Sequence, residues 1–206
     1  MGCSESYQLP PHFVTFQSWQ HPRVSSMIKA YVDGEYDWGI DHTVIMSLTG
    51  HSLDEAKLLI KSLSRGESVT INAASFLSAV IMLSEPNRRM ENSQLSLIFD
   101  IFDFGMQGQM SFDEFTIMLL CVITTQGIIM GRTNENPSDA AAIEIAKTMY
   151  AALDKPQNSS IALQEVAALY KEYFTSKSVN TMDKVFDRFL LGPDCLQWAS
   201  AVEEEK

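Results

Sequence analysis

The chain lacks features that mark several classes of protein. Its 15 basic residues are outnumbered by 26 acidic ones, and the net charge of −11 argues against nucleic-acid binding, because little would neutralise phosphates. Its three cysteines, Cys3, Cys121 and Cys195, form no CxxC pair, so we expect reduced thiols and a cytoplasmic location. We expect no secretory signal and no membrane span, since no apolar run approaches the ~18 residues that cross a bilayer.

Patterns typical of catalytic sites are also missing. The four histidines, His12, His21, His42 and His51, are scattered, and the chain has no H-E-x-x-H, G-x-S-x-G or P-loop pattern. Cys121 lies in an apolar stretch, where a buried thiol is inert. We therefore predict that the protein is not an enzyme.

What the chain does have is enough apolar residues to form a core. Hydrophobic residues make up 46% of its 206 residues, which suits one or two compact domains. Eleven methionines are more than usual. They fit either a groove that accepts varied helices or ordinary core packing.

The most specific motif lies at residues 97–119. An apolar helical pattern leads into a loop that opens with Asp103 and closes with Glu114, and a second apolar run follows. Gly108 stands at the sixth loop position, where the chain turns sharply, and Met110 stands at the eighth. A carboxylate at the twelfth position can bind Ca²⁺ through both oxygens. The motif therefore resembles the EF-hand (calmodulin-like) superfamily.

This third loop of the series departs from the family at two ligand positions. Gly105 and Gln107 stand at positions three and five, where acidic residues or asparagine are typical. With two carboxylates we expect a calcium affinity no better than ~10⁻⁴ M, too weak for a cytosolic sensor. The resemblance implies these candidate ligands: Asp103, Gln107, Gln109, Ser111 and Glu114.

Alignment on an apolar eighth position gives two earlier loops. The first, Asp33–Val44, has Ile40 at position eight but lacks the twelfth-position carboxylate and has Trp38 at position six. It is either a ligand set or an acidic turn without metal. The second loop, at residues 64–75 with Ile71 at position eight, has no acid at any ligand position, so we predict that it binds no metal. The acids of the first loop are Asp33, Glu35, Asp37 and Asp41.

A fourth loop runs from Asp154 to Glu165, with Ile161 at position eight. Its Pro156 constrains the turn. A fifth, weaker candidate around Leu196 lacks a twelfth-position acid and favours a simple helix-turn-helix. The candidate ligands of the fourth loop, implied by the same resemblance, are Asp154, Asn158 and Glu165.

The spacing of the loops, with the longest gap before the fourth, resembles the neuronal calcium sensor and calcineurin-B-like branches. The part from the third loop onwards resembles divergent EF-hand proteins of cilia and sperm flagella. The resemblance implies an all-α fold of paired helix-loop-helix lobes, with short β contacts of Ile40 with Ile71 and Met110 with Ile161. The implied limits are an extension at 1–22, a degenerate EF-hand pair at 23–84, a second pair at 92–175 and a C-terminal helical extension at 176–206.

The amino terminus carries two further signals. Met1-Gly2-Cys3 and the serine at position 6 match the pattern for N-myristoylation of Gly2, with Cys3 placed for palmitoylation. The alternative is an ordinary disordered amino terminus without acylation. The prolines of residues 7–22 do not favour a regular helix. We expect the aromatic residues of this segment to pack into a groove of the protein body or of a partner: Phe13, Phe16 and Trp19.

These patterns support two functional hypotheses. The favoured one is a non-catalytic, calmodulin-like adaptor or light-chain-type subunit that binds an amphipathic helix of a partner protein. The rival is a membrane-anchored calcium sensor that uses the third loop. Either protein would be cytoplasmic, at the inner face of a membrane or in a cilium or flagellum, and neither would bind nucleic acid.

Overall fold

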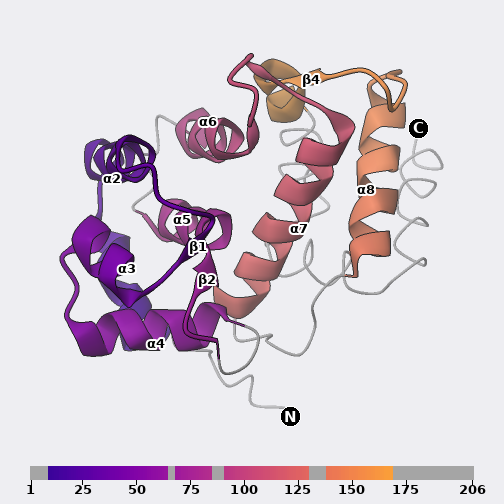
Figure 1. Cartoon of the computed structure of the whole chain (residues 1–206). Coiled ribbons are helices and arrows are strands. Elements are labelled where there is room, and N and C mark those ends of the chain that lie inside the picture. The colour runs from indigo at the N-terminus through magenta and orange to yellow at the C-terminus, as the bar shows by residue number, and fades with distance from the viewer. Residues whose placement is uncertain (1–8, 65–67, 85–90, 130–137, 169–206) are drawn as a thin grey trace, which may run out of the picture. The chain divides into compact units, whose positions relative to one another are not determined.

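The structure, a computed structural model, describes residues 9–64, 68–84, 91–129 and 138–168. Within these ranges the chain is mostly helical, with very short strands in the loops (Figure 1), as the all-α prediction requires. A further helix covers residues 163–168. The elements are α1 (Pro11–Val14), the 3₁₀ helix η1 (Thr15–Ser18), α2 (His21–Asp33), β1 (Gly39–Ile40), α3 (His42–Thr49), α4 (Leu53–Leu63), β2 (Ile71–Asn72), α5 (Ala73–Leu83), α6 (Glu91–Phe102), β3 (Gln109–Met110), α7 (Phe112–Ile129), α8 (Asp139–Ala152) and β4 (Ile161–Ala162).

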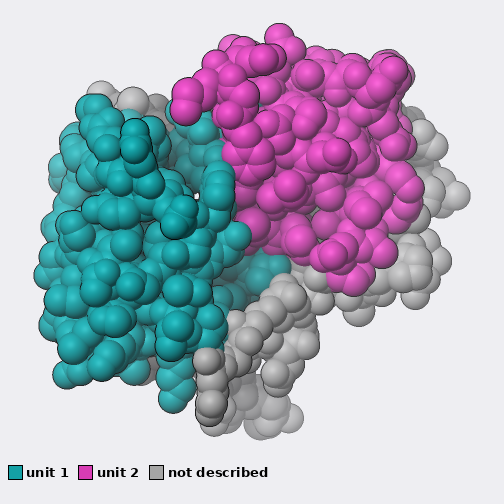
Figure 2. Space-filling model, viewed as in Figure 1, with its two compact units in different colours: residues 1–101, 124–133 teal, residues 102–123, 134–206 magenta. Residues whose placement is uncertain are grey.

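The chain divides into two compact units, which Figure 2 shows in different colours. Unit 1 comprises Met1–Ile101 and Thr124–Thr133, and unit 2 comprises Phe102–Ile123 and Asn134–Lys206. The third and fourth predicted loops belong to unit 2, and the first two belong to unit 1. The predicted domain limits stay a prediction.

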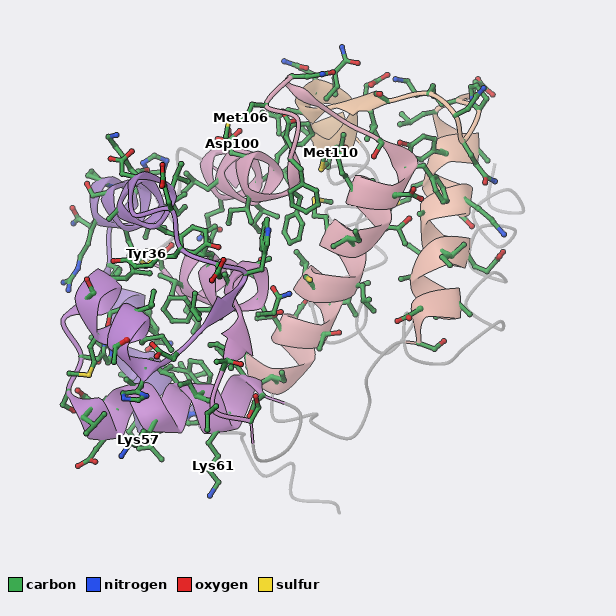
Figure 3. The ribbon with its side chains drawn as sticks, in the orientation of Figure 1. Tyr36, Lys57, Lys61, Asp100, Met106 and Met110 are labelled. Atoms are coloured by element: carbon green, nitrogen blue, oxygen red, sulfur yellow. The ribbon has the colours of Figure 1, made fainter. Side chains whose placement is uncertain are left out.

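Helix α4 shows how local sequence signals set the elements of unit 1. Its N-cap Ser52 and Glu55 form a capping box, in which each side chain bonds the other's backbone N–H. Lys57 and Lys61 point outwards into solvent (Figure 3). The apolar residues at helical spacing on the opposite face are buried: Ala56, Leu59, Ile60 and Leu63.

The two strand pairs follow the predicted register. Ile40 pairs with Ile71 in unit 1, and Met110 pairs with Ile161 in unit 2, both antiparallel. All four side chains are buried, with exposed fractions of 4% or less. Alignment of the loops on an apolar eighth position therefore identified these four residues, and the family resemblance identified their partners.

The amino-terminal aromatic residues pack into the body of unit 1. Phe13 and Phe16 are fully buried and Trp19 is 1% exposed. Their segment forms one turn of α-helix and one of 3₁₀ helix, in place of the irregular chain that its prolines favoured. Helix α1 packs against α4 and η1 packs against α5, so this segment covers two helices of unit 1.

Two histidines beside these aromatic rings have lowered pKa values. His12 bonds Ser62 (Nε2 to Oγ, 2.8 Å), and burial together with the nearby His51 lowers its pKa. The ring of His51 lies 5.1 Å from that of Phe16, between centroids. Burial lowers the pKa of His51 most; Glu55 opposes this shift and Arg23 adds to it. Both rings therefore favour the neutral form in the folded protein.

This cluster makes the stability of unit 1 depend on pH. Because the folded-state pKa values lie below the ordinary 6.5, stability is complete above that pH and falls as protons bind the unfolded chain. We expect the urea midpoint to drop between about pH 7 and about pH 5, and His51→Gln to flatten the drop. A Trp198→Phe background leaves Trp19 and Trp38, both in unit 1, as fluorescence reporters.

The matched control is His42→Gln, at the start of α3, which should keep the wild-type pH dependence. A midpoint that is equal at both pH values, or an unchanged slope in the His51 variant, contradicts the assignment.

Helix α7 corrects one expectation. Its 18 residues are long and apolar enough, by length and composition alone, to cross a bilayer, whereas we expected no such segment. This segment does not form a continuous apolar run in the sequence, because Asp113 and Glu114 interrupt its start and three threonines and a glutamine interrupt the rest. Core helices of soluble proteins pass the same test. The buried side chains of α7 include Phe115, Met118, Leu119, Ile123 and Ile128.

Candidate metal centre

The third loop begins with a carboxylate that closes the turn. Asp103 follows the end of α6 and is 8% exposed. Its Oδ1 accepts from the backbone N–H of Gln107 (3.1 Å) and its Oδ2 from that of Gly108 (2.6 Å). Gly108 has a φ of +71°, a conformation that favours glycine, as its sixth-position role requires. Asp103 therefore acts here as a hydrogen-bond acceptor for the loop backbone.

The carboxylate at the other end of this loop also has protein partners. Glu114 Oε2 accepts from the backbone N–H of Ser111 (2.7 Å) and from its hydroxyl (2.8 Å), and Ser111 Oγ accepts from the Glu114 N–H (3.3 Å). These are the reciprocal bonds of a capping box at the start of α7. Oε1 accepts from the N–H of Phe104 (3.1 Å), across the loop. A cation held by both oxygens of Glu114 would have to replace these donors.

The remaining predicted ligands of the third loop are exposed. Gln107 and Gln109 face solvent, and Gln109 lies in β3. Met106, between them and Asp103, is 83% exposed, whereas Met110 is fully buried (Figure 3). The loop therefore gathers the predicted oxygens into one segment, but only Asp103 is buried.

The fourth loop starts with a helix-ending turn. Asp154, its predicted first ligand, has a φ of +53° and is exposed. Its N–H donates to Ala151 O (3.0 Å), and the next N–H, of Lys155, donates to Tyr150 O (2.9 Å). This pair of bonds is a Schellman motif, which ends α8 with one residue in the left-handed region. Asn158, the second predicted ligand, is also exposed.

Lys155 is the residue of this loop that spacing alone did not single out. Its Nζ donates to Glu165 Oε2 (2.7 Å) and to Ser160 O (2.7 Å). Glu165 Oε2 also accepts from the N–H of Ala162 (2.8 Å). Burial would raise the pKa of Glu165, but the Ala162 bond and the bond and charge of Lys155 outweigh it and lower the pKa. The predicted twelfth-position ligand is thus paired with an ammonium group.

In the first loop the carboxylates act separately. Asp33 pairs with Lys29 one helical turn away (2.7 Å), in an exposed ion pair. Asp41 is the N-cap of α3 and accepts from the N–H groups of Thr43 (2.9 Å) and Val44 (3.1 Å). The Thr43 hydroxyl bond is the largest cause of the lowered pKa of Asp41. These contacts favour the acidic-turn interpretation of the loop.

In the second loop, Asn72 follows the eighth-position isoleucine as N-cap of α5, accepting from the N–H of Ser75 (3.2 Å). Across the ranges that the structure describes, no group of three or more His, Cys, Asp and Glu side chains is placed to hold a metal ion. The predicted lipidation residues Gly2 and Cys3, the extension at 176–206 and the candidate around Leu196 lie outside those ranges.

Comparison with known proteins identifies no relative of this chain. No protein-family model matches the chain, and a search of curated proteins finds no match. The function therefore has to be argued from the loops and from the contacts around them.

Proposed function

We propose that this protein is a non-catalytic, calmodulin-like adaptor whose degenerate EF-hand loops serve as a scaffold for binding an amphipathic helix of a partner. Three observations support the proposal: a shared loop geometry, carboxylates that bond protein donors, and an amino-terminal segment that covers part of unit 1.

The loop geometry supports the EF-hand assignment. In each of the four loops the eighth-position residue is buried in a two-residue antiparallel pair: Ile40 with Ile71, and Met110 with Ile161. A helix begins two residues later each time. This is the geometry expected when paired EF-hand loops support each other back to back, and Gly108 at the sixth position of the third loop agrees with it.

The single observation that carries the scaffold role is the bonding of the two twelfth-position carboxylates. Glu114 bonds the backbone at both ends of its loop, and Glu165 bonds Lys155 and Ala162. A calcium switch needs an ion that binds one conformation much better than another. Loops that protein donors already close leave little binding energy for such a switch.

The amino-terminal segment bears on where a partner helix would bind. In unit 1, residues 11–18 already pack against α4 and α5, so a partner would have to displace them or bind elsewhere. The net charge of −11 favours a basic amphipathic helix. Acylation of Gly2 and Cys3, and a membrane or ciliary location, stay predictions that suit either functional hypothesis.

The test is a calorimetric Ca²⁺ titration of the full chain in the presence of Mg²⁺. We expect no heat of binding at micromolar Ca²⁺, and the same trace for wild type, Glu114→Gln and the control Glu144→Gln, whose carboxylate lies in an exposed pair with Lys147. In chelator, the wild-type chain should still bind a basic amphipathic helical peptide. Failure to bind that peptide counts against the adaptor.

The second candidate is the calcium sensor, favoured by Asp103 and Glu114 at the two ends of one loop with Gly108 in the required turn. Micromolar binding that Glu114→Gln abolishes and Glu144→Gln keeps would establish it in place of the scaffold. Trp38, which is 48% exposed, provides a parallel fluorescence signal.

A further inference from the structure

The Schellman turn at the end of α8 decides which side chain faces the fourth loop. Asp154 takes the left-handed position, and its side chain is exposed. Aspartate tolerates this conformation better than most residues. The turn places the following residue, Lys155, so that its ammonium group reaches the loop carbonyl of Ser160 and the carboxylate of Glu165. The side chain of Asp154, the first-position acid, is therefore exposed to solvent, and the side chain of Lys155 bonds the loop oxygens instead.

The two acceptors of Lys155 are the oxygens that a calcium ion would use. Counted from Asp154, Ser160 is the seventh residue of the loop and Glu165 is the twelfth. In an EF-hand, position seven binds Ca²⁺ through its backbone carbonyl and position twelve through its carboxylate. Lys155 lies within 2.7 Å of both oxygens. A divalent cation at the same oxygens would meet the positive charge of the ammonium group.

We propose that Lys155 is the internal cation of the fourth loop: its ammonium group replaces Ca²⁺ at the seventh- and twelfth-position oxygens and holds the loop closed without metal. This inference rests on the EF-hand interpretation of the loop under the proposed function. It goes further in naming the group that substitutes for the metal. The pair is partly sheltered, with exposed fractions of 24% for Lys155 and 33% for Glu165, so solvent screens it less than a surface pair.

The proposal predicts how fast the loop amides exchange with deuterium in chelator. Lys155→Met keeps the apolar stem and removes the charge, and we expect the amides of residues 157–164 to exchange about tenfold faster. Lys155→Gln, a second uncharged variant, should do the same if the methionine variant folds poorly. The control Lys147→Met removes a lysine from the exposed face of α8 and should leave these amides unchanged.

A double-variant cycle assigns the effect to the pair. Glu165→Gln keeps an oxygen that can accept from Ala162 N–H but removes the charge that Lys155 meets. We expect the double variant Lys155→Met/Glu165→Gln to exchange no faster than Lys155→Met alone, because the two changes break one interaction. Fully additive effects would show that Lys155 does not act through Glu165.

The readout also separates this proposal from the proposed function. Unchanged loop exchange in both Lys155 variants, or slower exchange of residues 157–164 in the wild-type chain when millimolar Ca²⁺ is added, overturns the internal-cation role. Neither result changes what the Ca²⁺ titration of Glu114→Gln shows, because Glu114 lies in the other loop of unit 2. Conversely, a micromolar site at the third loop would overturn the scaffold function and leave the Lys155 result intact.

Discussion

Replacement of Phe16 by alanine should lower the free energy of unfolding of unit 1 by about 3–5 kcal/mol, the usual range for a fully buried phenylalanine. Phe16 has an exposed fraction of 0%, and its ring packs against those of Trp19 (5.1 Å between centroids), His51 (5.1 Å) and Phe76 (6.3 Å). The change removes the ring that joins the amino-terminal segment to α5. The cavity and the lost aromatic contacts both contribute.

The measurement is urea unfolding followed by tryptophan fluorescence in the Trp198→Phe background described above. Val14→Ala is the matched control: it truncates the last residue of the preceding helix α1, whose side chain is 47% exposed, and we expect a change within about 0.5 kcal/mol. Equal midpoints for Phe16→Ala and Val14→Ala would show that the segment contributes little to unit 1. In that case it would be free to leave its position when a partner binds.

This prediction has a functional consequence. A segment bound with several kcal/mol is a permanent part of unit 1, and α4 and α5 are then closed to a partner helix unless the partner binds more tightly. Phe13, Phe16 and Trp19 lie at three-residue spacing, as the anchors of a partner helix would. The amino-terminal segment of the chain itself thus covers α4 and α5 in unit 1. Under the proposed adaptor role, a partner helix would then bind to other surfaces of the protein.

The sequence predicted best what depends on local pattern. Alignment on the apolar eighth position gave the four residues, and the resemblance to paired EF-hand loops implied the pairing of Ile40 with Ile71 and of Met110 with Ile161. Serine is a favoured N-cap residue, and Ser52 at α4 and Ser138 at α8 both accept backbone bonds from the third residue of the helix. The capping signals involve residues three positions apart, so the local sequence is enough to indicate them.

The hydrogen-bond partners of the candidate ligands were less predictable, because they depend on the backbone conformation of the loop and on the length of each side chain. Nothing in the spacing indicates that Asp154 adopts a positive φ and turns outwards. Lys155 stands at position two, which is not a ligand position, so the EF-hand ligand pattern gives no reason to consider it. Similarly, Glu114 reaches Phe104 N–H ten residues away, a contact that depends on how the loop closes. A lysine at position two opposite a twelfth-position glutamate is the signal that could have been read.

The second large effect is expected at Tyr150, in unit 2. Tyr150 is 1% exposed, and its ring packs edge-on against Phe112 (5.2 Å between centroids) and against Phe115 (5.9 Å). Tyr150→Ala removes these contacts and should destabilise unit 2 by about 3–5 kcal/mol, by analogy with other large aromatic residues. The alanine variant keeps the backbone carbonyl that accepts from Lys155 N–H, but it removes the ring that packs the end of α8 beside the fourth loop.

Tyr150→Phe is the matched control, because it keeps the ring and loses only the hydroxyl. That hydroxyl donates to Ser159 O over 3.4 Å, a long bond, so we expect a loss of about 1 kcal/mol or less. Hydrogen exchange of α8 peptides in chelator separates the two variants: alanine should speed exchange by about a hundredfold or more, phenylalanine by less than about tenfold. Similar rates in both variants would mean that ring packing does not hold α8.

The hydroxyl adds an alkaline signature to this comparison. Burial, with the charges of Glu165, Glu114 and Asp113, raises the pKa of Tyr150 from 10.0 to about 12. A raised folded-state pKa means that the stability of unit 2 is complete below about pH 10 and falls above it, as the unfolded tyrosine ionises first. Tyr150→Phe should lose part of this alkaline fall, while its loss of stability at neutral pH stays at about 1 kcal/mol or less. An identical alkaline fall in both proteins would show that Tyr150 does not lie among the loop carboxylates, and the packing of α8 against the third and fourth loops would then have to be revised.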